Sequence, residues 1–273
     1  MSINLESLST LTGTLAEVEG VFTLDDDSKV SLGASPSVAL TLSDSSIAVD
    51  QANTLAAQTT GIVTATIYEG TYTALNGLNE TANSYALNLS ETLTVDQANT
   101  LQGKTVGVIT ATISNGAITD LVNLTNAQSN SSYTIVITDT GTQTAANINT
   151  IKLANTSGTI TASGIETVSG SASAVISAYA AVNTGFGNEN IYINSGTATL
   201  SQARDLNALT DGNVSATLAD TSISALLDGS SGLTETGGTN AYTITIGSGD
   251  AAASASNLNL SLIHISEPTR PSV

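Results

Sequence analysis

Two kinds of hydrophobic pattern alternate along this chain. In short runs, apolar residues occupy every second position, as in Ile109-Thr110-Ala111-Thr112-Ile113, and this period of two predicts a β-strand with one buried face. Such runs begin at positions 38, 62, 85, 108, 133, 159, 190, 214 and 242, mostly 23–26 residues apart. The regular spacing predicts neighbouring parallel strands, because each connection is long enough for a helix that returns the chain.

Between these runs the apolar residues are spaced by threes and fours, which predicts helices. The two clearest stripes are Leu8, Leu11, Leu15, Val18 and Phe22, and their counterparts Ile165, Val168, Ala172, Val175 and Tyr179. Two reciprocal capping boxes are expected to begin helices, at Thr94-x-x-Gln97 and Thr199-x-x-Gln202. Gly103 and Gly212 stand where such helices are expected to end.

The chain also repeats itself. The heptapeptide VDQANTL at 49–55 returns at 95–101, and GIVTATI at 61–67 returns as GVITATI at 107–113, both at an offset of 46 residues. A longer period relates LSTLTGTLAEV at 8–18 to IETVSGSASAV at 165–175. Internal periods of this length are typical of solenoids, in which each repeat packs only on its neighbours.

These patterns predict an α/β solenoid of stacked strand–helix coils, about 23–26 residues each, with a parallel sheet. An all-β solenoid is the alternative. Residues 1–259 are expected to form a single repeat array, with long copies at about 8–164 and 165–259, the second truncated. The final segment 260–273 is expected to be a non-native tail, because LSLIHISEPTR at 260–270 resembles a translated sequencing adapter. His264, the one histidine of the chain, lies in that tail.

Composition narrows the possible functions. The chain has 23 acidic and 5 basic residues and a formal charge of −18, so nucleic-acid binding, which needs clustered Lys and Arg, is not expected. It has no cysteine, which excludes disulfides, thiolate metal sites and thiol nucleophiles. No apolar run is long enough to span a bilayer, so membrane insertion is not expected either.

No catalytic constellation is visible, because a Ser/His/Asp or Cys/His triad needs residues that the repeat array lacks. The sequence therefore predicts no enzyme, no catalytic residue and no cofactor. The weak candidates for calcium ligands are Asp25, Asp26, Asp27 and Asp250. The glycine-rich segment 185–190 lacks a third glycine and precedes a strand, so we interpret it as a loop rather than a dinucleotide site.

Two polar features recur with the repeat. The Asn of ANTL, at Asn53 and Asn99 and in looser copies at Asn149 and Asn207, is expected to bridge backbone groups of successive coils; an amide ladder that binds sugar is the alternative. Outward strand positions are mostly threonine and are expected to form rows across the sheet. These positions are Thr64, Thr66, Thr110, Thr112, Thr134, Thr138, Thr243 and Thr245. Such arrays resemble the faces of ice-binding solenoids, although the high β-propensity of threonine also explains them.

The segments YTIVITDT, AANINTI, GTITA and VDQANTLQGKTVGVITATI resemble the long tandem-repeat surface proteins, often RTX- or adhesin-like, of marine bacteria including planktonic cyanobacteria. The resemblance implies a structural or adhesive repeat segment of a large extracellular or cell-surface protein. Its expected partners are neighbouring repeats of the same protein, and cell-surface glycans or other cells. The alternative function is a binding module that uses the threonine-rich face or acidic loops for ice, glycan or calcium.

Overall fold

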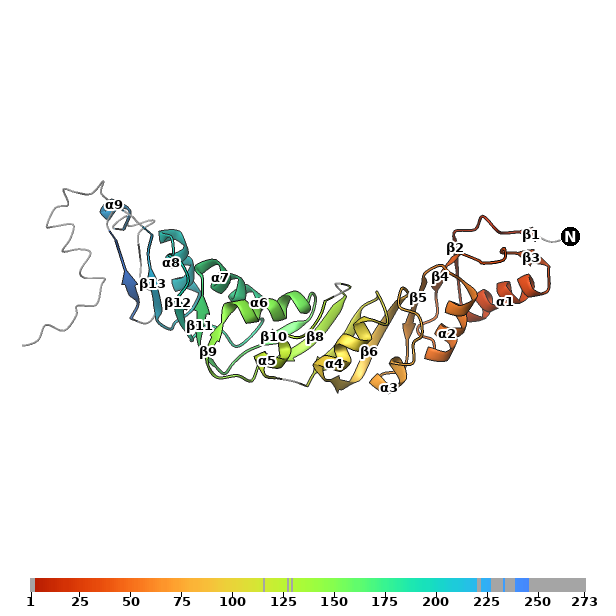
Figure 1. Ribbon diagram of the computed structural model, residues 1–273, viewed down its shortest axis with the longest axis horizontal. Helices are drawn as coiled ribbons and strands as arrows, with labels where there is room; N and C mark the ends of the chain where they lie inside the picture. The colour runs from red at the N-terminus through yellow and green to blue at the C-terminus, as the bar shows by residue number, and fades with distance from the viewer. Residues whose placement is uncertain are drawn as a thin grey trace, which may run out of the picture. The chain divides into compact units, whose positions relative to one another are not determined.

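The computed structural model describes residues 3–114, 116–126, 128, 130–219, 222–226, 233 and 239–245. The chain is an α/β protein that divides into two compact units (Figure 1). The first unit contains residues 1–135 and 153–159, and the second contains residues 136–152 and 160–273. The tail 260–273 and the calcium candidate Asp250 lie outside the described residues.

The first unit is built on parallel strands connected by helices. The order in its sheet is β10-β8-β7-β6-β5-β4-β2, so that neighbours in the sheet are mostly neighbours in the sequence. Its strands are β2 (Thr10–Gly13), β4 (Ala39–Leu42), β5 (Val63–Ile67), β6 (Ser84–Leu93), β7 (Ile109–Ile113), β8 (Ser131–Val136) and β10 (Thr159–Thr161). Its helices are α1 (Leu15–Asp26), α2 (Val49–Gln58), α3 (Tyr72–Leu75), α4 (Val95–Gln102) and α5 (Ile118–Leu121). Two short strands, β1 (Ile3–Asn4) and β3 (Val30–Ser31), pair separately.

The second unit follows the same plan. Its sheet has the order β14-β13-β12-β11-β9, again with parallel pairing. The strands are β9 (Gly141–Thr144), β11 (Ile165–Gly170), β12 (Asn190–Ile193), β13 (Val214–Thr217) and β14 (Ala241–Thr243). The helices are α6 (Ala145–Ala154), α7 (Ala172–Ala181), α8 (Leu200–Leu209) and α9 (Ile223–Leu226), and α7 packs against α8 (Figure 1). The boundary between the units passes through β8, α6 and β10.

The 46-residue offset of the sequence recurs in the elements. Helix α2 begins at Val49 and α4 at Val95, and strand β5 begins at Val63 and β7 at Ile109, so each pair is 46 residues apart. The short helices α3 and α5, which begin at positions 72 and 118, have the same separation. The duplicated heptapeptide therefore occupies the same place in two successive strand–helix–strand segments.

The core lies on the inward face of the strands and on one side of each long helix. In β5 the side chains of Val63, Ala65 and Ile67 are buried while Thr64 is exposed, which confirms the strand pattern expected from the period of two. In α2 the buried side chains are Val49, Ala52, Leu55 and Ala56. Small and aliphatic residues fill this interior, and the few bulkier members include Tyr85 and Tyr133, which are 1% and 0% exposed.

The two long apolar stripes are helical only in their second halves. Residues Thr10–Gly13 form β2, and α1 begins at Leu15; likewise β11 ends at Gly170 and α7 begins at Ala172. The helix prediction for Leu8, Leu11, Ile165 and Val168 is therefore wrong. The physical reason is a cap: the side chains of Thr14 and Ser171 accept hydrogen bonds from the backbone N–H three residues later, and this fixes the helix start.

The predicted capping boxes at Thr94/Gln97 and Thr199/Gln202 are confirmed, and a third at Thr14/Glu17 was not anticipated. Hydrogen bonds from the Thr14 N–H and hydroxyl lower the pKa of Glu17 in the folded chain. Because that pKa is depressed, the contribution of the Glu17 carboxylate to stability is present above its ordinary pKa and is lost as the pH falls through the pKa of the folded chain.

The described helices between the strands also show that the all-β alternative is wrong.

Candidate functional site

A Thr-x-Gly motif precedes four of the described strands and makes the same link at three of them. The fourth copy, Thr156-Ser157-Gly158 before β10, donates instead to the Ser131 carbonyl at 3.0 Å. Before β5, β7 and β13 stand Thr59, Thr105 and Thr210, each followed two residues later by glycine. The three threonines are 8%, 0% and 4% exposed. Their hydroxyls donate to backbone carbonyls in or directly before the preceding strand. The distances are 2.7 Å to Val38, 2.9 Å to Tyr85 and 2.6 Å to Glu189. The motif therefore joins β5, β7 and β13 to the preceding strands β4, β6 and β12.

The glycine of this motif is required by close approach of two backbones. A Cβ atom at Gly61, Gly107 or Gly212 would lie 2.4, 2.3 or 2.4 Å from the same carbonyl oxygen that accepts the threonine hydroxyl. No side chain fits at such a distance without moving the backbone. Gly212 was expected to end a helix, but α8 already ends at Leu209, so that prediction is corrected to a close-contact role.

The expected structural role of the repeated asparagine is confirmed at two of its positions. Asn53 Nδ2 donates to the Gly77 carbonyl at 2.9 Å, and its Oδ1 accepts from the Asn79 N–H at 3.0 Å. Asn99 makes the same pair of bonds 46 residues later, at 2.9 Å to the Asn123 carbonyl and 2.8 Å from the Thr125 N–H. Both amides thereby bridge to the following turn of the chain.

The two looser copies differ in their partners. Asn149 Nδ2 donates to the Ala174 carbonyl at 2.9 Å, and Asn207 Oδ1 accepts from the Asn240 side chain at 2.6 Å. Asn207 is 4% exposed, so it is a buried polar link rather than a surface amide. These bonds use the amide groups that a sugar-binding ladder would have to present to its ligand.

Several carboxylates accept hydrogen bonds from the first backbone N–H groups of a helix that lies earlier in the chain. The Leu15 N–H donates to Asp44 Oδ2 at 2.6 Å, and the Val49 N–H donates to both carboxylate oxygens of Glu69, at 3.0 and 3.1 Å. The Tyr72 N–H donates to Glu91 Oε1 in the same way. A carboxylate is favourable at this position because the first helical amides lack partners and carry partial positive charge. Part of the strong acidity of the chain is therefore structural.

We expect Glu69→Gln to lower the free energy of unfolding of the first unit by about 1 kcal/mol, because a neutral amide accepts more weakly at a helix N-terminus. Glu80→Gln is the matched control, since it removes the same charge from an exposed residue that caps none of the described helices. Urea denaturation with hydrogen exchange at the Val49 amide measures the difference. Equal losses in the two variants would show that the effect is one of net charge.

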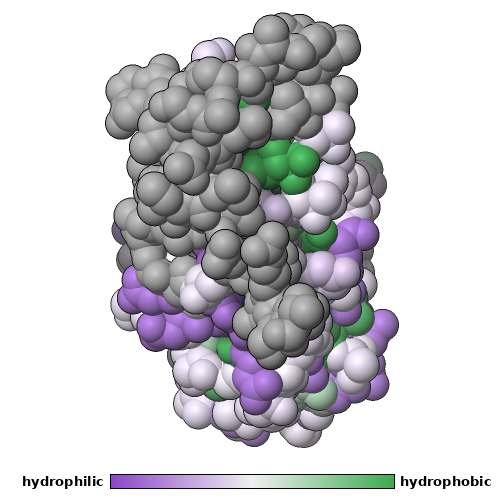
Figure 2. All heavy atoms as spheres, turned by 90° about the vertical axis from the view of Figure 1, so that its left-hand side faces the viewer, coloured by the Kyte–Doolittle hydropathy of each residue, from purple (hydrophilic) through white to green (hydrophobic). Residues whose placement is uncertain are grey.

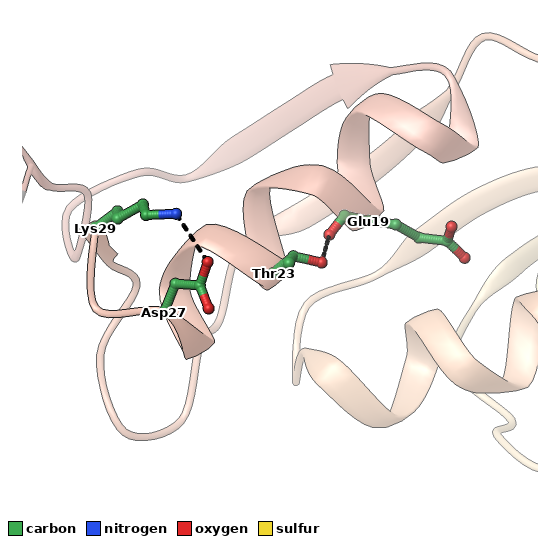
Figure 3. A network of polar contacts seen from close by, with 4 residues as sticks. All are labelled: Glu19, Thr23, Asp27 and Lys29. Carbon is green, nitrogen blue, oxygen red and sulfur yellow. Dashed lines mark hydrogen bonds and ion pairs between the residues drawn. The ribbon is translucent and has the colours of Figure 1, made fainter.

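The calcium candidates Asp25, Asp26 and Asp27 lie at the C-terminal end of α1. Asp25 Oδ1 accepts from the Leu32 N–H at 2.7 Å, and Asp27 Oδ2 pairs with Lys29 Nζ at 2.9 Å. Figure 3 shows the Asp27–Lys29 pair beside the last turn of the helix, with the Thr23 hydroxyl donating to the Glu19 carbonyl. Within the described residues, no three acidic or histidine side chains are grouped closely enough to hold a metal ion.

The outward threonines are found on the solvent side of the strands, as expected. Thr64, Thr110, Thr112, Thr134, Thr138, Thr243 and Thr245 are exposed and Thr66 is half-buried. Their register gives one row through Thr12, Thr41 and Thr64 and another through Thr92, Thr112 and Thr134. The rows are interrupted, because Thr64 is followed by Ser84 and Thr66 by Ala86. The prediction of threonine rows holds only in part, because the residues of β6 that stand beside β5 are not threonines.

A hollow of about 380 Å³ lies on this outer face between β4 and β7. Hydroxyl groups from Thr64, Thr66 and Ser84 line it together with the apolar side chains of Val106 and Val108. These two valines are 36% and 52% exposed, so the face combines methyl groups with hydroxyl groups. The sequence analysis did not single out these valines. They stand two and four residues before Thr110, so the alternation of side chains along a strand places them on the same outer face.

The glycine-rich segment 185–190 is a loop between α7 and β12, up to the first residue of the strand, as expected from the sequence. This loop contains a buried acidic residue that the sequence did not predict, Glu189, which is only 4% exposed. Both carboxylate oxygens accept from the Gly187 N–H at 3.0 Å, and Oε2 also accepts from the Asn188 N–H at 3.2 Å. Gly185 and Gly187 have φ values of +108° and +136°, which other residues rarely adopt. A glutamate directly before a strand gave no signal that it would be buried.

Among the coloured residues of Figure 2, hydrophobic ones form small separate areas between hydrophilic and intermediate ones. None of the helices in the described ranges is long and apolar enough to cross a membrane.

Comparisons of this chain with protein-family models, with characterised proteins and with solved structures find no match. Function must therefore be inferred from the arrangement of the residues.

Proposed function

We propose that this chain is a structural or adhesive repeat segment of a large extracellular or cell-surface protein, without catalytic activity, and that its units are α/β solenoids. The observation that carries the proposal is the recurrence of the same links between successive turns. Thr59 and Thr105 reach back to the preceding strand, and Asn53 and Asn99 reach forward to the following turn. A chain in which each turn is completed by its neighbours is suited to extension by further copies.

Deletion of one 46-residue block tests the solenoid. Removing residues 49–94 joins Ala48 to Val95, so that α4 with its VDQANTL sequence takes the place of α2. In a solenoid the shortened chain folds, because every remaining turn meets an equivalent neighbour. We expect the shortened chain to keep the circular dichroism spectrum of an α/β protein and to unfold cooperatively at a temperature close to that of the full chain. Removing residues 49–84, which is out of register with the repeat, is the matched control and should abolish the transition.

Loss of folding in both deletion variants would contradict the solenoid, because it would show that residues 49–94 supply contacts that no other turn can replace. The adhesive role is tested separately. The full chain, displayed on cells that do not otherwise adhere, is expected to increase their attachment to glycan-coated surfaces or to one another. Folded, displayed protein that changes neither kind of attachment would contradict adhesion and leave a purely structural segment.

The second candidate function is a binding module that uses the hollow on the outer face of the first unit. Hydroxyl groups of Thr64 and Ser84 beside the methyl groups of Val108 suit a sugar ring, which presents both hydroxyl and C–H surfaces. The interrupted threonine rows favour a glycan over the regular lattice of ice. Val108→Asp should abolish binding in a glycan array, and Val136→Asp, an exposed valine outside the hollow, is the control. Equal binding by both variants would contradict this site.

A further inference from the structure

A charged residue occupies a core position in the second unit. The carbonyls that accept from Thr59, Thr105 and Thr210 belong to Val38, Tyr85 and Glu189, which are therefore equivalent positions in three turns. Their side chains are 2%, 1% and 4% exposed. The fold accepts an apolar or aromatic side chain here, so it does not require a carboxylate. A buried carboxylate is costly unless it is hydrogen-bonded, which makes its presence informative.

Helix α7, which faces Glu189, also carries a more polar residue than its counterpart α1 in the first unit. Tyr179 in α7 lies eight residues after the N-cap Ser171, as Phe22 in α1 lies eight residues after the N-cap Thr14. A phenylalanine in the first unit thus corresponds to a tyrosine in the second. The Tyr179 hydroxyl is buried beside the Glu189 carboxylate and the Thr210 hydroxyl. Burial raises the pKa of Tyr179, and the neighbouring Glu189 carboxylate raises it further, so the phenol stays neutral.

The carboxylate holds its own loop closed. Glu189 accepts from the amides of Gly187 and Asn188, both in the loop that connects α7 to β12. The same loop is tied to α7 by the ring of Phe186, whose centroid lies 4.9 Å from that of Tyr179. It is tied to the segment after α8 by the Asp211 N–H, which donates to the Gly187 carbonyl at 2.7 Å. Without the carboxylate, two loop amides lose a charged acceptor at once.

We propose that Glu189 is a proton-operated latch, whose ionised carboxylate keeps the loop 185–188 closed and whose protonation opens this loop while the rest of the second unit stays folded. Asn183 and Thr184, which bond to the backbone of residues 160–162, belong to the part that stays folded. Among the described residues, the titratable side chain that faces the carboxylate from α7 is Tyr179, which does not change charge at acid pH. From the turn after α8, Thr210 contributes a hydroxyl, and Asp211 is exposed and contacts the loop through its backbone. The proton acceptor of the latch is therefore Glu189 itself.

Hydrogen exchange of the full chain, corrected for the intrinsic rate at each pH, tests the latch. Between about pH 7 and about pH 3 we expect the Gly187 and Asn188 amides to lose about tenfold or more of their protection, as when charge-assisted hydrogen bonds become neutral ones. The α7 and β12 amides should keep most of theirs. Residues 84–87, which contain the equivalent position Tyr85 in the first unit, serve as the internal reference.

Two variants separate the latch from general acid sensitivity. Glu189→Gln keeps the shape of the side chain but not its charge, so its loop should be poorly protected at both pH values. Asp211→Asn removes a neighbouring exposed charge and should retain the wild-type response. The proposal is overturned if the wild-type loop is equally protected at both pH values, or if Glu189→Gln responds like the wild type. Unfolding of the whole second unit in Glu189→Gln would also overturn it, because the carboxylate would then hold the unit and not the loop.

Discussion

Gly107→Ala is expected to lower the free energy of unfolding of the first unit by about 3 kcal/mol, at the upper end of the usual cost of overpacking. The added Cβ would lie 2.3 Å from the Tyr85 carbonyl oxygen and 2.6 Å from its carbon. Because these are backbone atoms of a buried strand, they cannot rotate away as a flexible side chain would. Urea denaturation followed by the helical circular dichroism signal measures the loss.

Gly20→Ala is the matched control for this substitution. Gly20 lies within α1 of the same unit, and a Cβ there would meet nothing within 4 Å. Because alanine is the better helix former, this control should be neutral or stabilising by about 0.5–1 kcal/mol. If Gly107→Ala behaved like Gly20→Ala, the strands would not be held as closely as the structure shows.

Thr105→Val is expected to cost about 2–4 kcal/mol, because burial of unpaired backbone groups is expensive while the shape of the side chain is unchanged. The Thr105 hydroxyl oxygen accepts from the Tyr85 N–H at 2.7 Å and from the Gly107 N–H at 2.9 Å, in a fully buried place. Valine leaves both amides without an acceptor. The measurement is the midpoint and slope of urea denaturation, with exchange of the Tyr85 amide as the local readout.

The exposed Thr110 provides the control, because Thr110→Val makes the same chemical change on the solvent side of β7. It should alter stability by less than about 0.5 kcal/mol. Comparable losses at the two positions would mean that the methyl-for-hydroxyl exchange acts through strand propensity and not through the buried amides.

The sequence predicted the elements wherever the hydrophobic period was long and regular. The strands near Val63, Ile109 and Val214 and the helices begun by Thr94 and Thr199 were found as expected. The error at Leu11 and Val168 has a simple cause. A strand followed directly by a helix can place apolar residues three or four apart, so spacing alone does not show where one element ends.

The polar links were predictable only where the sequence repeats with high identity. Asn53 and Asn99 stood out because the surrounding heptapeptide is duplicated, whereas Thr-x-Gly is too short and too common in this chain to be noticed. The role of Asp44 and Glu69 depends on a partner 20 or more residues away, which only the packing of successive turns reveals. Burial of Glu189 contradicts the usual exposure of glutamate and could be recognised only by comparison with Val38 and Tyr85.

The helix-closing carboxylates also bear on the order in which the chain folds as it leaves the ribosome. Leu15 and Val49 receive their acceptors from Asp44 and Glu69, which are synthesised later, whereas Thr105 finds its acceptor in a strand that already exists. Strand β7 therefore forms against a strand that has already been synthesised, whereas α1 and α2 are completed only after residues 44 and 69 have emerged. We expect nascent chains arrested at increasing lengths to gain protease resistance in steps, with the ordered region one turn behind the point of synthesis.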